Sequence, residues 1–280
     1  MSFSVGIIGL PNVGKSTLFK ALTKKQVDIA DYPFTTINPN IGTVAVPDNR
    51  LRAISEIIKP EKTVPTIIEF IDIAGLIKNA HKGEGLGNQF LAQIRNCDAV
   101  CQVIKAFGES PTPEKDIETI ETELQMKDYQ SREKENLLNK KPKILLFNAK
   151  SPDDFPLGLD LKTEAEASEL SEEEKKELEI KSGLDKLILA CYNVLGLVTF
   201  YTITGGKEVR AWTLKNGMKA PQAGGKVHSD FEEKFIKAET VNWQELVGAG
   251  SWQKAREKGL IQTAGKDYII QDGDVIEFKV

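Results

Sequence analysis

The chain has 280 residues, 40% of them hydrophobic and 28% charged, which predicts a globular protein of one large or two ordinary domains. Its net charge of −4 excludes a polycation, so any contact with nucleic acid must come from a local patch. No apolar run approaches the roughly 20 residues that cross a bilayer, residues 1–9 lack the features of a secretory signal, and the three cysteines form no C-x-x-C pair. We therefore expect a cytoplasmic protein in a reducing compartment, with no membrane partner.

A phosphate-binding loop follows the first predicted strand. The apolar run at residues 3–8 leads into G-L-P-N-V-G-K-S-T at residues 9–17, and a helical pattern begins at residue 18. In this context the pattern G-x-x-x-x-G-K-[ST] binds nucleotide phosphates through backbone N–H groups and the helix N-terminus. Lys15 is expected to reach the β- and γ-phosphates as a catalytic cation, and the Ser16 hydroxyl to ligate Mg²⁺. The predicted nucleotide contacts of the loop are Asn12, Val13, Gly14, Lys15, Ser16 and Thr17.

The next segment predicts a switch loop. Pro33 and Pro39 favour an extended, irregular conformation. A threonine hydroxyl in such a loop, 20 residues after Ser16, can complete the coordination of Mg²⁺ when a γ-phosphate is present. We assign this metal-binding role to Thr36 rather than Thr35. The alternative is that both are ordinary loop threonines.

Two β-rich runs then lead to a second metal-binding position. Residues 41–46 and 63–73 are predicted to form a strand pair that runs into D-I-A-G at residues 72–75. In a D-x-x-G pattern the aspartate holds Mg²⁺ through its water shell, and the glycine N–H can meet the γ-phosphate. Because the pattern follows a P-loop and a threonine loop, we assign Asp72 to the metal and Gly75 to the catalytic site.

Residue 76 does not supply a group that orients the attacking water. Ras-like GTPases carry glutamine there, whereas Leu76 cannot hydrogen-bond to water. Hydrolysis is therefore expected to be slow, to use another group or to depend on a partner. His81, in the glycine-rich segment 78–88, is a candidate catalytic residue that could approach the γ-phosphate. The alternative, which we favour on composition, is a solvated loop histidine.

Helices and strands alternate through the rest of this half. Alternation of this kind predicts an α/β fold with a mainly parallel sheet that is covered on both faces. Ser171 and Glu174 predict a capping box within the acidic helical stretch 163–181. The other expected elements are helices at 89–96 and 184–195, strands at 98–107 and 143–147, and a mostly helical stretch at 109–141.

The base-reading loop departs from the GTPase pattern. Residues 148–151 read N-A-K-S where a guanine-specific GTPase carries N-K-x-D. The missing carboxylate would accept two charge-assisted hydrogen bonds from guanine. Its loss costs roughly 1.5–3 kcal/mol, or about one to two decades of base preference. Asn148 and Ser151 remain as predicted nucleotide contacts, and Asp153 or Asp154 could replace the carboxylate, which keeps GTP as an alternative to ATP.

The pattern changes at residue 197 from helices to short strands. About 84 residues of strands with one or two helices suit a β-grasp module. The expected elements are strands at 198–202 and 208–213, a helix at 221–227, and two strands within 267–278 joined by a turn at Asp272-Gly273.

Trp212 lies close in sequence to several basic residues. This combination suits RNA binding, in which the ring stacks on a base and the basic side chains contact phosphates. Residues 197–280 carry twelve Lys and Arg against eleven Asp and Glu, a balance too small for an electrostatic argument. Composition alone favours a core tryptophan with solubilising lysines, and a cap or turn role for His228. The basic residues are Lys207, Arg210, Lys215 and Lys219.

Four stretches of the first half carry a family resemblance. They read G-L-P-N-V-G-K-S-T, Y-P-F-T-T-I-N-P-N, D-I-A-G-L-I-K-N-A-H-K-G-E-G-L-G-N-Q-F and D-I-E-T-I-E-T-E-L. They resemble the YchF/Obg-like ATPase family, Obg-related P-loop proteins with an apolar residue in place of the catalytic glutamine. The string A-P-Q-A-G-G-K-V-H-S-D-F-E-E-K-F-I-K-A-E resembles the TGS domain, a ubiquitin-like β-grasp module, that ends such proteins.

The resemblance implies a preference for ATP over GTP and slow hydrolysis that a ribosomal partner accelerates. It also implies association with the ribosome, with RNA contact through the C-terminal domain. Two lengths depart from the family pattern. Only residues 109–141 stand where family members carry a long helical hairpin, and residues 151–162 leave no room for the helix that usually follows the base-reading loop.

We therefore predict an Obg-type, Ras-like P-loop NTPase domain at residues 1–196, with a reduced helical insert at 109–141. A TGS-like β-grasp domain is predicted at residues 197–280. The predicted activity is slow, Mg²⁺-dependent ATP hydrolysis by a ribosome-associated switch in translation or the stress response. The alternatives are a GTP-specific GTPase, and an RNA- or ribosome-binding adaptor with incidental nucleotide turnover.

Overall fold

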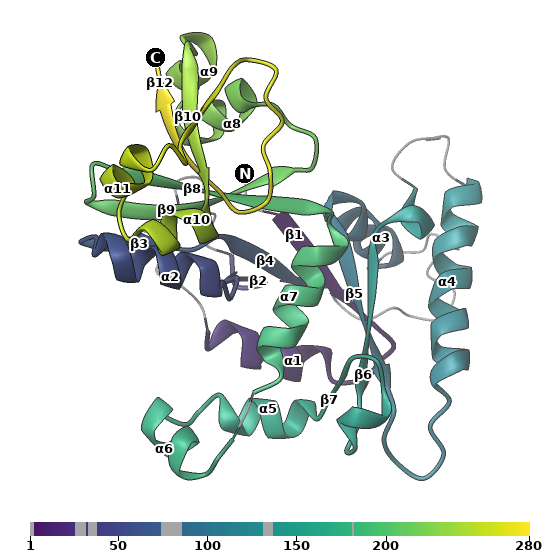
Figure 1. Ribbon diagram of the computed structural model, residues 1–280. Coiled ribbons are helices and arrows are strands. Elements are labelled where there is room, and N and C mark those ends of the chain that lie inside the picture. Colours follow the sequence, from purple (N-terminus) through teal and green to yellow (C-terminus); the bar gives the residue numbers. More distant parts are fainter. Residues whose placement is uncertain (1–2, 26–31, 33–37, 74–85, 131–136, 181) are drawn as a thin grey trace. The chain divides into compact units, whose positions relative to one another are not determined.

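The computed structural model describes residues 3–25, 32, 38–73, 86–130, 137–180 and 182–280 (Figure 1). The chain forms two compact units. The first consists of Met1–Val46 and Ile67–Leu195, and the second of Pro47–Thr66 and Gly196–Val280. The division expected from the sequence differs in one respect, because residues 47–66 belong to the second unit rather than to the nucleotide half.

A six-stranded sheet in the order β2-β4-β1-β5-β6-β7 forms the centre of the first unit. Neighbouring strands are parallel except for β2 and β4, which are antiparallel. The mainly parallel α/β sheet expected from the sequence is confirmed. The strands are β1 (Phe3–Ile8), β2 (Ile41–Ala45), β4 (Ile67–Asp72), β5 (Ala99–Lys105), β6 (Lys143–Asn148) and β7 (Gly158–Leu159).

Helices cover both faces of this sheet (Figure 1). On one face lie α3 (Leu86–Asn96) and α4 (Pro113–Gln130), and on the other α1 (Lys15–Thr23) and α7 (Leu184–Val194). The capping box predicted at Ser171 is present and begins α6. The shorter segments are the 3₁₀ turns η3 (Leu138–Lys140) and η4 (Pro152–Asp154) and the helices α5 (Leu161–Ala167) and α6 (Glu172–Glu177).

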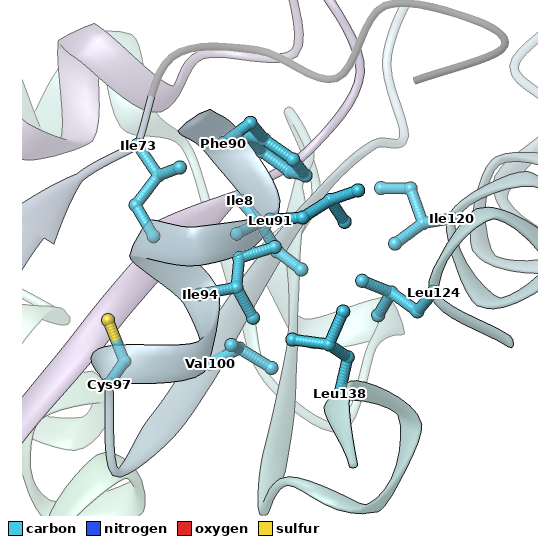
Figure 2. Close-up of a cluster of buried hydrophobic side chains, with 10 residues drawn as sticks. All are labelled: Ile8, Ile73, Phe90, Leu91, Ile94, Cys97, Val100, Ile120, Leu124 and Leu138. Atoms are coloured by element: carbon cyan, nitrogen blue, oxygen red, sulfur yellow. The ribbon is translucent and has the colours of Figure 1, made fainter. Parts of the chain in front are cut away.

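A buried apolar cluster holds α3 and α4 against the sheet (Figure 2). Ile120 and Leu124 of α4, which stand at helical spacing, are buried in it. Ile8 at the end of β1 belongs to the same cluster, so the strand that leads into the phosphate-binding loop is anchored by this core. The members are Ile8, Ile73, Phe90, Leu91, Ile94, Cys97, Val100, Ile120, Leu124 and Leu138.

The second unit also has a six-stranded sheet, in the order β11-β10-β12-β8-β9-β3. Strands β8 and β12 are parallel, as are β3 and β9, and the other neighbours are antiparallel. The strands are β3 (Lys62–Val64), β8 (Leu197–Thr204), β9 (Glu208–Lys215), β10 (Lys237–Asn242), β11 (Gln262–Ala264) and β12 (Asp274–Lys279).

Helices pack on both faces of this second sheet. Successive strand residues point to opposite faces, so Phe200 and Tyr201 of β8 belong to two different buried clusters. The cluster with Tyr201 includes side chains of α2, α10 and α11, and the cluster with Phe200 includes side chains of α8. The helices are α2 (Asn49–Ile58), α8 (Ala220–Val227), α9 (Ser229–Glu233), α10 (Trp243–Ala249) and α11 (Trp252–Glu257).

The β-branched run at residues 63–73 forms two strands rather than one. β3 joins the sheet of the second unit beside β9, whereas β4 pairs with β2 in the first unit. Pro65 lies between the two strands and has no amide hydrogen to continue a ladder. The predicted pairing with residues 41–46 is therefore correct only for the part that follows Pro65.

The strand pair predicted within residues 267–278 is wrong. One strand, β12, forms there and pairs with β10 and β8. Before it, Ile269 makes an isolated bridge to Lys219. Gly273, at φ 92°, does turn the chain, but the partners of β12 come from distant parts of the sequence. Among the helices of the described residues, none has the length and hydropathy of a membrane span.

Candidate functional site

The loop between β1 and α1 adopts backbone conformations that its glycines allow. Gly9 has φ 155° and Gly14 has φ 108°. A Cβ on Gly9 would lie 2.6 Å from the carbonyl oxygen of Val103, and a Cβ on Gly14 would lie 2.7 Å from Nδ2 of Asn148. Asn12 is left-handed at φ 62°, a region that asparagine tolerates. Glycine is therefore required twice, where the loop passes close to β5 and β6.

Helix α1 starts at Lys15 without a side-chain cap at its N-terminus. Its first N–H groups and its dipole are thus available to an anion. Val13 is buried and anchors the loop, Thr17 is half-buried, and Ser16 is exposed. This arrangement places the Ser16 hydroxyl at the open side of the loop.

The Lys15 side chain is buried against its own loop. Its Nζ donates to the backbone carbonyl of Gly9 at 3.1 Å and to that of Leu10 at 2.9 Å. Burial lowers the pKa of Lys15, and the nearby Asp72 carboxylate opposes this shift. The ammonium group is therefore held inside the loop, within electrostatic reach of Asp72.

Asp72 ends β4 beside this lysine. Burial raises the pKa of the Asp72 carboxyl, and the charge of Lys15 acts in the opposite direction. The backbone N–H of Asp72 donates to the carbonyl of Asn40 at 2.9 Å, which joins the start of β2 to the end of β4. The carboxylate is thus fixed at the same edge of the sheet as the P-loop, with its negative charge only partly compensated.

The residues at this edge fit Mg²⁺. Ser16 and Asp72 offer oxygen atoms, the donor type that Mg²⁺ prefers. No three His, Cys, Asp or Glu side chains converge on a metal position within the described part of the chain. A cation here would take most of its ligands from phosphate and water, which is how Mg²⁺ binds at phosphate-transfer sites.

Asn148 connects the P-loop to the loops that follow β6 and β7. Its Nδ2 donates to the carbonyl of Val13 at 3.0 Å, and its Oδ1 accepts from the backbone N–H of Leu161 at 3.2 Å. The side chain is 8% exposed. Both polar atoms of this predicted nucleotide contact are therefore bonded to backbone groups of the protein.

The other predicted base contact lies in a different setting. Ser151 is exposed and precedes the 3₁₀ turn η4, and Asp153 and Asp154 within that turn are also exposed. Asp160, which sequence reasoning did not single out, accepts from the backbone N–H groups of Lys162 and Thr163 at the start of α5. Its signal in the sequence was an aspartate directly before a helical pattern.

Leu161 makes a contact with Asn148 that the sequence did not predict. No pattern in the sequence pairs it with Asn148. In the structure its N–H bonds to Asn148, and its Cδ1 lies 3.0 Å from the position of a Cβ on Gly14. Three further predicted site residues, Thr36, Gly75 and His81, lie outside the described residues, as does Leu76.

Trp212 is packed within the second unit, as its core interpretation requires. Its Nε1 donates to Oγ1 of Thr202 at 2.9 Å, and its ring stacks on Phe200 with centroids 6.4 Å apart. The Arg210 guanidinium lies 5.1 Å from the indole centroid. The predicted cap role of His228 is confirmed, because its Nδ1 accepts from the N–H of Asp230 at the start of α9.

Two family models match the chain. Residues 4–149 match a model described as a 50S ribosome-binding GTPase. Residues 197–280 match the YchF-type GTPase C-terminal model, which is described as a protein of unknown function. The two matches cover the P-loop side of the first unit and the C-terminal part of the second.

Full-length relatives and a solved structure are also similar. The ribosome-binding ATPase YchF of Bacillus subtilis is 40% identical, with 100% of this chain and 99% of the relative covered. The protein of the same name from Escherichia coli O157:H7 is 37% identical, with 99% of each chain covered. The structure of the Schizosaccharomyces pombe YchF GTPase has a TM-score of 0.84 at 32% identity, covering 99% of this chain and 98% of that one.

The Bacillus subtilis alignment also measures a difference in length. It extends over 364 positions, although this chain has 280 residues. The relative therefore has residues at about 84 positions where this chain has none. A shortened chain is what the two short stretches noted in the sequence predict.

Proposed function

Because this chain belongs to the YchF family of P-loop NTPases, we propose that it is a ribosome-associated ATPase. It hydrolyses ATP slowly in the presence of Mg²⁺ and acts as a nucleotide-dependent switch in translation or the stress response. The observation that carries the proposal is the position of Lys15, which is buried in the loop at an uncapped helix N-terminus within electrostatic reach of Asp72. A ribosomal partner implies a cytoplasmic location.

The P-loop binds the triphosphate and stabilises charge during hydrolysis. The backbone N–H groups of residues 12–17 face the phosphates, and Lys15 exchanges its bonds to the Gly9 and Leu10 carbonyls for the β- and γ-phosphate oxygens. Phosphoryl transfer spreads negative charge over the γ-phosphate oxygens and the leaving oxygen. Once the nucleotide is bound, the ammonium group and the amide dipoles already face this charge and stabilise it without further reorganisation.

Ser16, Thr36 and Asp72 would hold the metal ion. When bound, Mg²⁺ would neutralise part of the phosphate charge. Asp72 would act through the water shell and Ser16 through its hydroxyl. The raised pKa of Asp72 supports this assignment, because a cation beside a buried carboxylate compensates the charge that burial disfavours.

The attacking water is placed by groups other than residue 76. Leucine has no hydrogen-bonding group, so we assign contact with the γ-phosphate to the Gly75 N–H and approach to the water to His81. Slow intrinsic turnover follows from this composition. A ribosomal partner is expected to accelerate turnover.

ATP is the proposed substrate because the protein lacks the charged group that reads guanine. Residue 151 is serine, and both polar atoms of Asn148 bond to the backbone of Val13 and Leu161. Neither residue presents a carboxylate to a guanine edge. Asn148 would thus support the shape of the base pocket, and Ser151 would present its exposed hydroxyl to the base.

GTP is the second candidate substrate. The model that matches residues 4–149 is described as a GTPase, and the solved Schizosaccharomyces pombe relative is likewise called a GTPase. Asp153 and Asp154 are exposed close to the base loop and could supply the missing carboxylate. Direct comparison of the two nucleotides separates these candidates.

We further propose that the C-terminal part of the second unit is a TGS-like β-grasp domain. The strand order β9-β8-β12-β10-β11 supports this assignment. Its outer pairs, β8–β9 and β10–β11, are antiparallel, and the β8–β12 pair at its centre is parallel. Contact with ribosomal RNA is assigned to this domain. Its exposed Lys207 and Lys215 are better placed for phosphate contacts than Trp212, which is packed inward.

Calorimetric titration of the full chain with ATP and with GTP, each with Mg²⁺, tests the substrate. Tighter ATP binding supports the proposal, and GTP binding tighter by an order of magnitude overturns the ATP assignment. Phosphate release with and without ribosomes tests the partner, and stimulation by ribosomes is expected. If Lys15→Ala abolishes turnover while ribosome co-sedimentation persists, binding and hydrolysis are separable and the adaptor function gains support.

A further inference from the structure

Residues 47–66 connect the two strands that frame the nucleotide site to the interior of the second unit. The chain leaves the first unit after Val46, at the end of β2, and returns to it at Ile67, the first residue of β4. Between these points it forms α2 and β3, both within the second unit. We refer to residues 47–66 as the connecting segment.

The connecting segment forms part of the core of the second unit. Leu51 and Ile54 of α2 are buried in one cluster with Tyr201 and Val209. β3 adds an edge strand in parallel to β9, with Thr63 opposite Val209. Figure 1 shows α2, in dark blue, beside the strands and α10 of this unit. The second unit therefore contains residues from the N-terminal half as integral parts of its sheet and core.

A polar network fixes the start of the segment. The hydroxyl of Tyr201 donates to Oδ2 of Asp48 at 2.5 Å. Arg50 bonds to Oδ1 of Asp48 at 3.0 Å and to Oδ2 of Asp272 at 2.6 Å, and its guanidinium lies 5.7 Å from the centroid of the Tyr201 ring. Asp272 in turn accepts from the N–H of Thr199 at 2.8 Å. The Asp48 side chain at the centre of the network is 9% exposed, whereas that of Asp272 is 54% exposed, so the network runs from the interior of the unit to its surface.

The other end of each flanking strand lies at the nucleotide site. β2 and β4 pair over five residues, from Ala45 opposite Ile67 to Ile41 opposite Ile71. The next residue of β4 is Asp72, whose N–H bonds to the carbonyl of Asn40. At about 3.4 Å per residue this antiparallel ribbon is roughly 17 Å long. One ribbon thus ends at the proposed metal-binding carboxylate and begins at the connecting segment.

We propose that the connecting segment couples the nucleotide site to the second unit, so that nucleotide binding and the packing of α2 and β3 affect each other. The inference rests on the proposed function and adds a route of regulation to it. A nucleotide that orders the Asp72 end of the ribbon also restricts its other end, because paired strands move together. By linkage, the factor by which the nucleotide shifts the packing equilibrium of the segment equals the factor by which that packing changes nucleotide affinity.

A matched pair of tyrosine variants tests the coupling. Tyr201→Phe removes a hydroxyl that bonds to the connecting segment, at Asp48. Tyr268→Phe removes a hydroxyl that bonds to Asp274 at 2.9 Å, within the same unit and outside the segment. The expected result is that Tyr201→Phe changes the Kd for MgATP by about fivefold, within the usual range of coupling between sites. Tyr268→Phe should leave the Kd within about a factor of 1.5. Equal effects of the two variants would overturn the proposal.

Hydrogen exchange of the unaltered chain provides a test that does not depend on how a variant folds. MgATP should slow amide exchange in Asn49–Ile58 and Lys62–Val64, while amides of α8 in the same unit keep their rates. If MgATP binds in a manner that depends on Lys15 but amide exchange in the connecting segment is unchanged, the coupling is overturned and the proposed function stands. Absence of any MgATP binding overturns both the coupling and the proposed function.

Discussion

Nδ2 of Asn148 donates to the backbone carbonyl of Val13 at 3.0 Å, across 135 positions of the chain. Oδ1 of the same amide accepts from the backbone N–H of Leu161. One buried side chain therefore joins the P-loop to the loops that follow β6 and β7. We therefore expect Asn148 to act on the nucleotide by holding the P-loop in place. Its effect should be the same for any purine triphosphate.

Asn148→Asp should weaken ATP and GTP binding alike, by about tenfold. The substitution replaces the donor that faces the Val13 carbonyl with a carboxylate oxygen, and a lost bond at a buried polar group costs about 1–3 kcal/mol. Calorimetry with both nucleotides measures the effect, with the exposed Ser151→Ala as the companion variant. A changed ATP-to-GTP ratio at unchanged overall affinity would show instead that Asn148 reads the base.

Lys15→Ala should lower the rate of phosphate release by at least about 100-fold, because removal of one charge-stabilising group at a transition state costs this much or more. The matched control is Lys20→Ala on the same helix. Lys20 is exposed and pairs with Glu169 at the protein surface. Single-turnover assays at saturating ATP give the rates. Comparable losses in both variants would mean that helix stability, rather than the loop cation, was lost.

The raised pKa of Asp72 predicts a pH dependence of stability in the absence of nucleotide. Burial raises this pKa above its value in the unfolded chain, so the folded state binds more protons in the window between the two values. The free energy of unfolding should therefore fall as pH rises through that window, which begins near the ordinary aspartate value of about 4.

Urea unfolding between pH 4 and pH 7 checks this sign. Asp72→Asn removes the titrating group, so its stability relative to the unaltered chain should increase as pH rises through the window. Mg²⁺ competes with the proton for the carboxylate, so added Mg²⁺ with ATP should reduce the difference in the unaltered chain. A stability difference that shrinks with rising pH would contradict the predicted shift.

The three cysteines are buried, so their thiols should react slowly in the native protein. Burial raises the pKa of Cys97 to about 11. A hydrogen bond with Cys101, together with burial, raises the pKa of Cys191 well above its ordinary value. At pH 8 the Cys97 thiol is therefore ionised to about 0.1%, against about 25% for an ordinary thiol, and only the thiolate reacts.

Labelling with a chromogenic disulfide reagent should accordingly be at least about 100-fold slower in buffer than in urea. Gln244→Cys introduces a thiol at an exposed position of α10 and should react at once in the native state. Rapid labelling of the unaltered chain would show that the buried cysteines become accessible without unfolding.

Local patterns predicted much of the first unit. The P-loop, the strand before it and the helix after it depend on residues close together in the sequence, and so do the Ser171 capping box and the spacing of Ile120 and Leu124. Such features follow from steric and hydrogen-bonding preferences of short stretches. The residues proposed for the site in this loop, including Lys15, were predicted from the same local pattern.

Features that depend on distant pairings were not predictable in the same way. The apolar face of α2 shows that the helix is packed, but it does not show that the partners are Tyr201 and Val209. Similarly, β12 pairs with β8 and β10 rather than in a local hairpin. The bonds of Asn148 to Val13 and Leu161 also join residues that are distant in the sequence. Periodicity specifies which side chains are buried and leaves open what they are buried against.

The discontinuity of the second unit restricts how this protein can exchange parts with others. A genetic crossover at residue 196 would transfer the C-terminal strands but leave Leu51, Ile54 and β3 behind. The transplanted piece would expose Tyr201 and Val209 to water and would end in an uncovered β9 edge, which invites aggregation. Transfer of the whole second unit requires three cuts, before residue 47, after residue 66 and before residue 196, so the nucleotide half and the C-terminal half are expected to be inherited together.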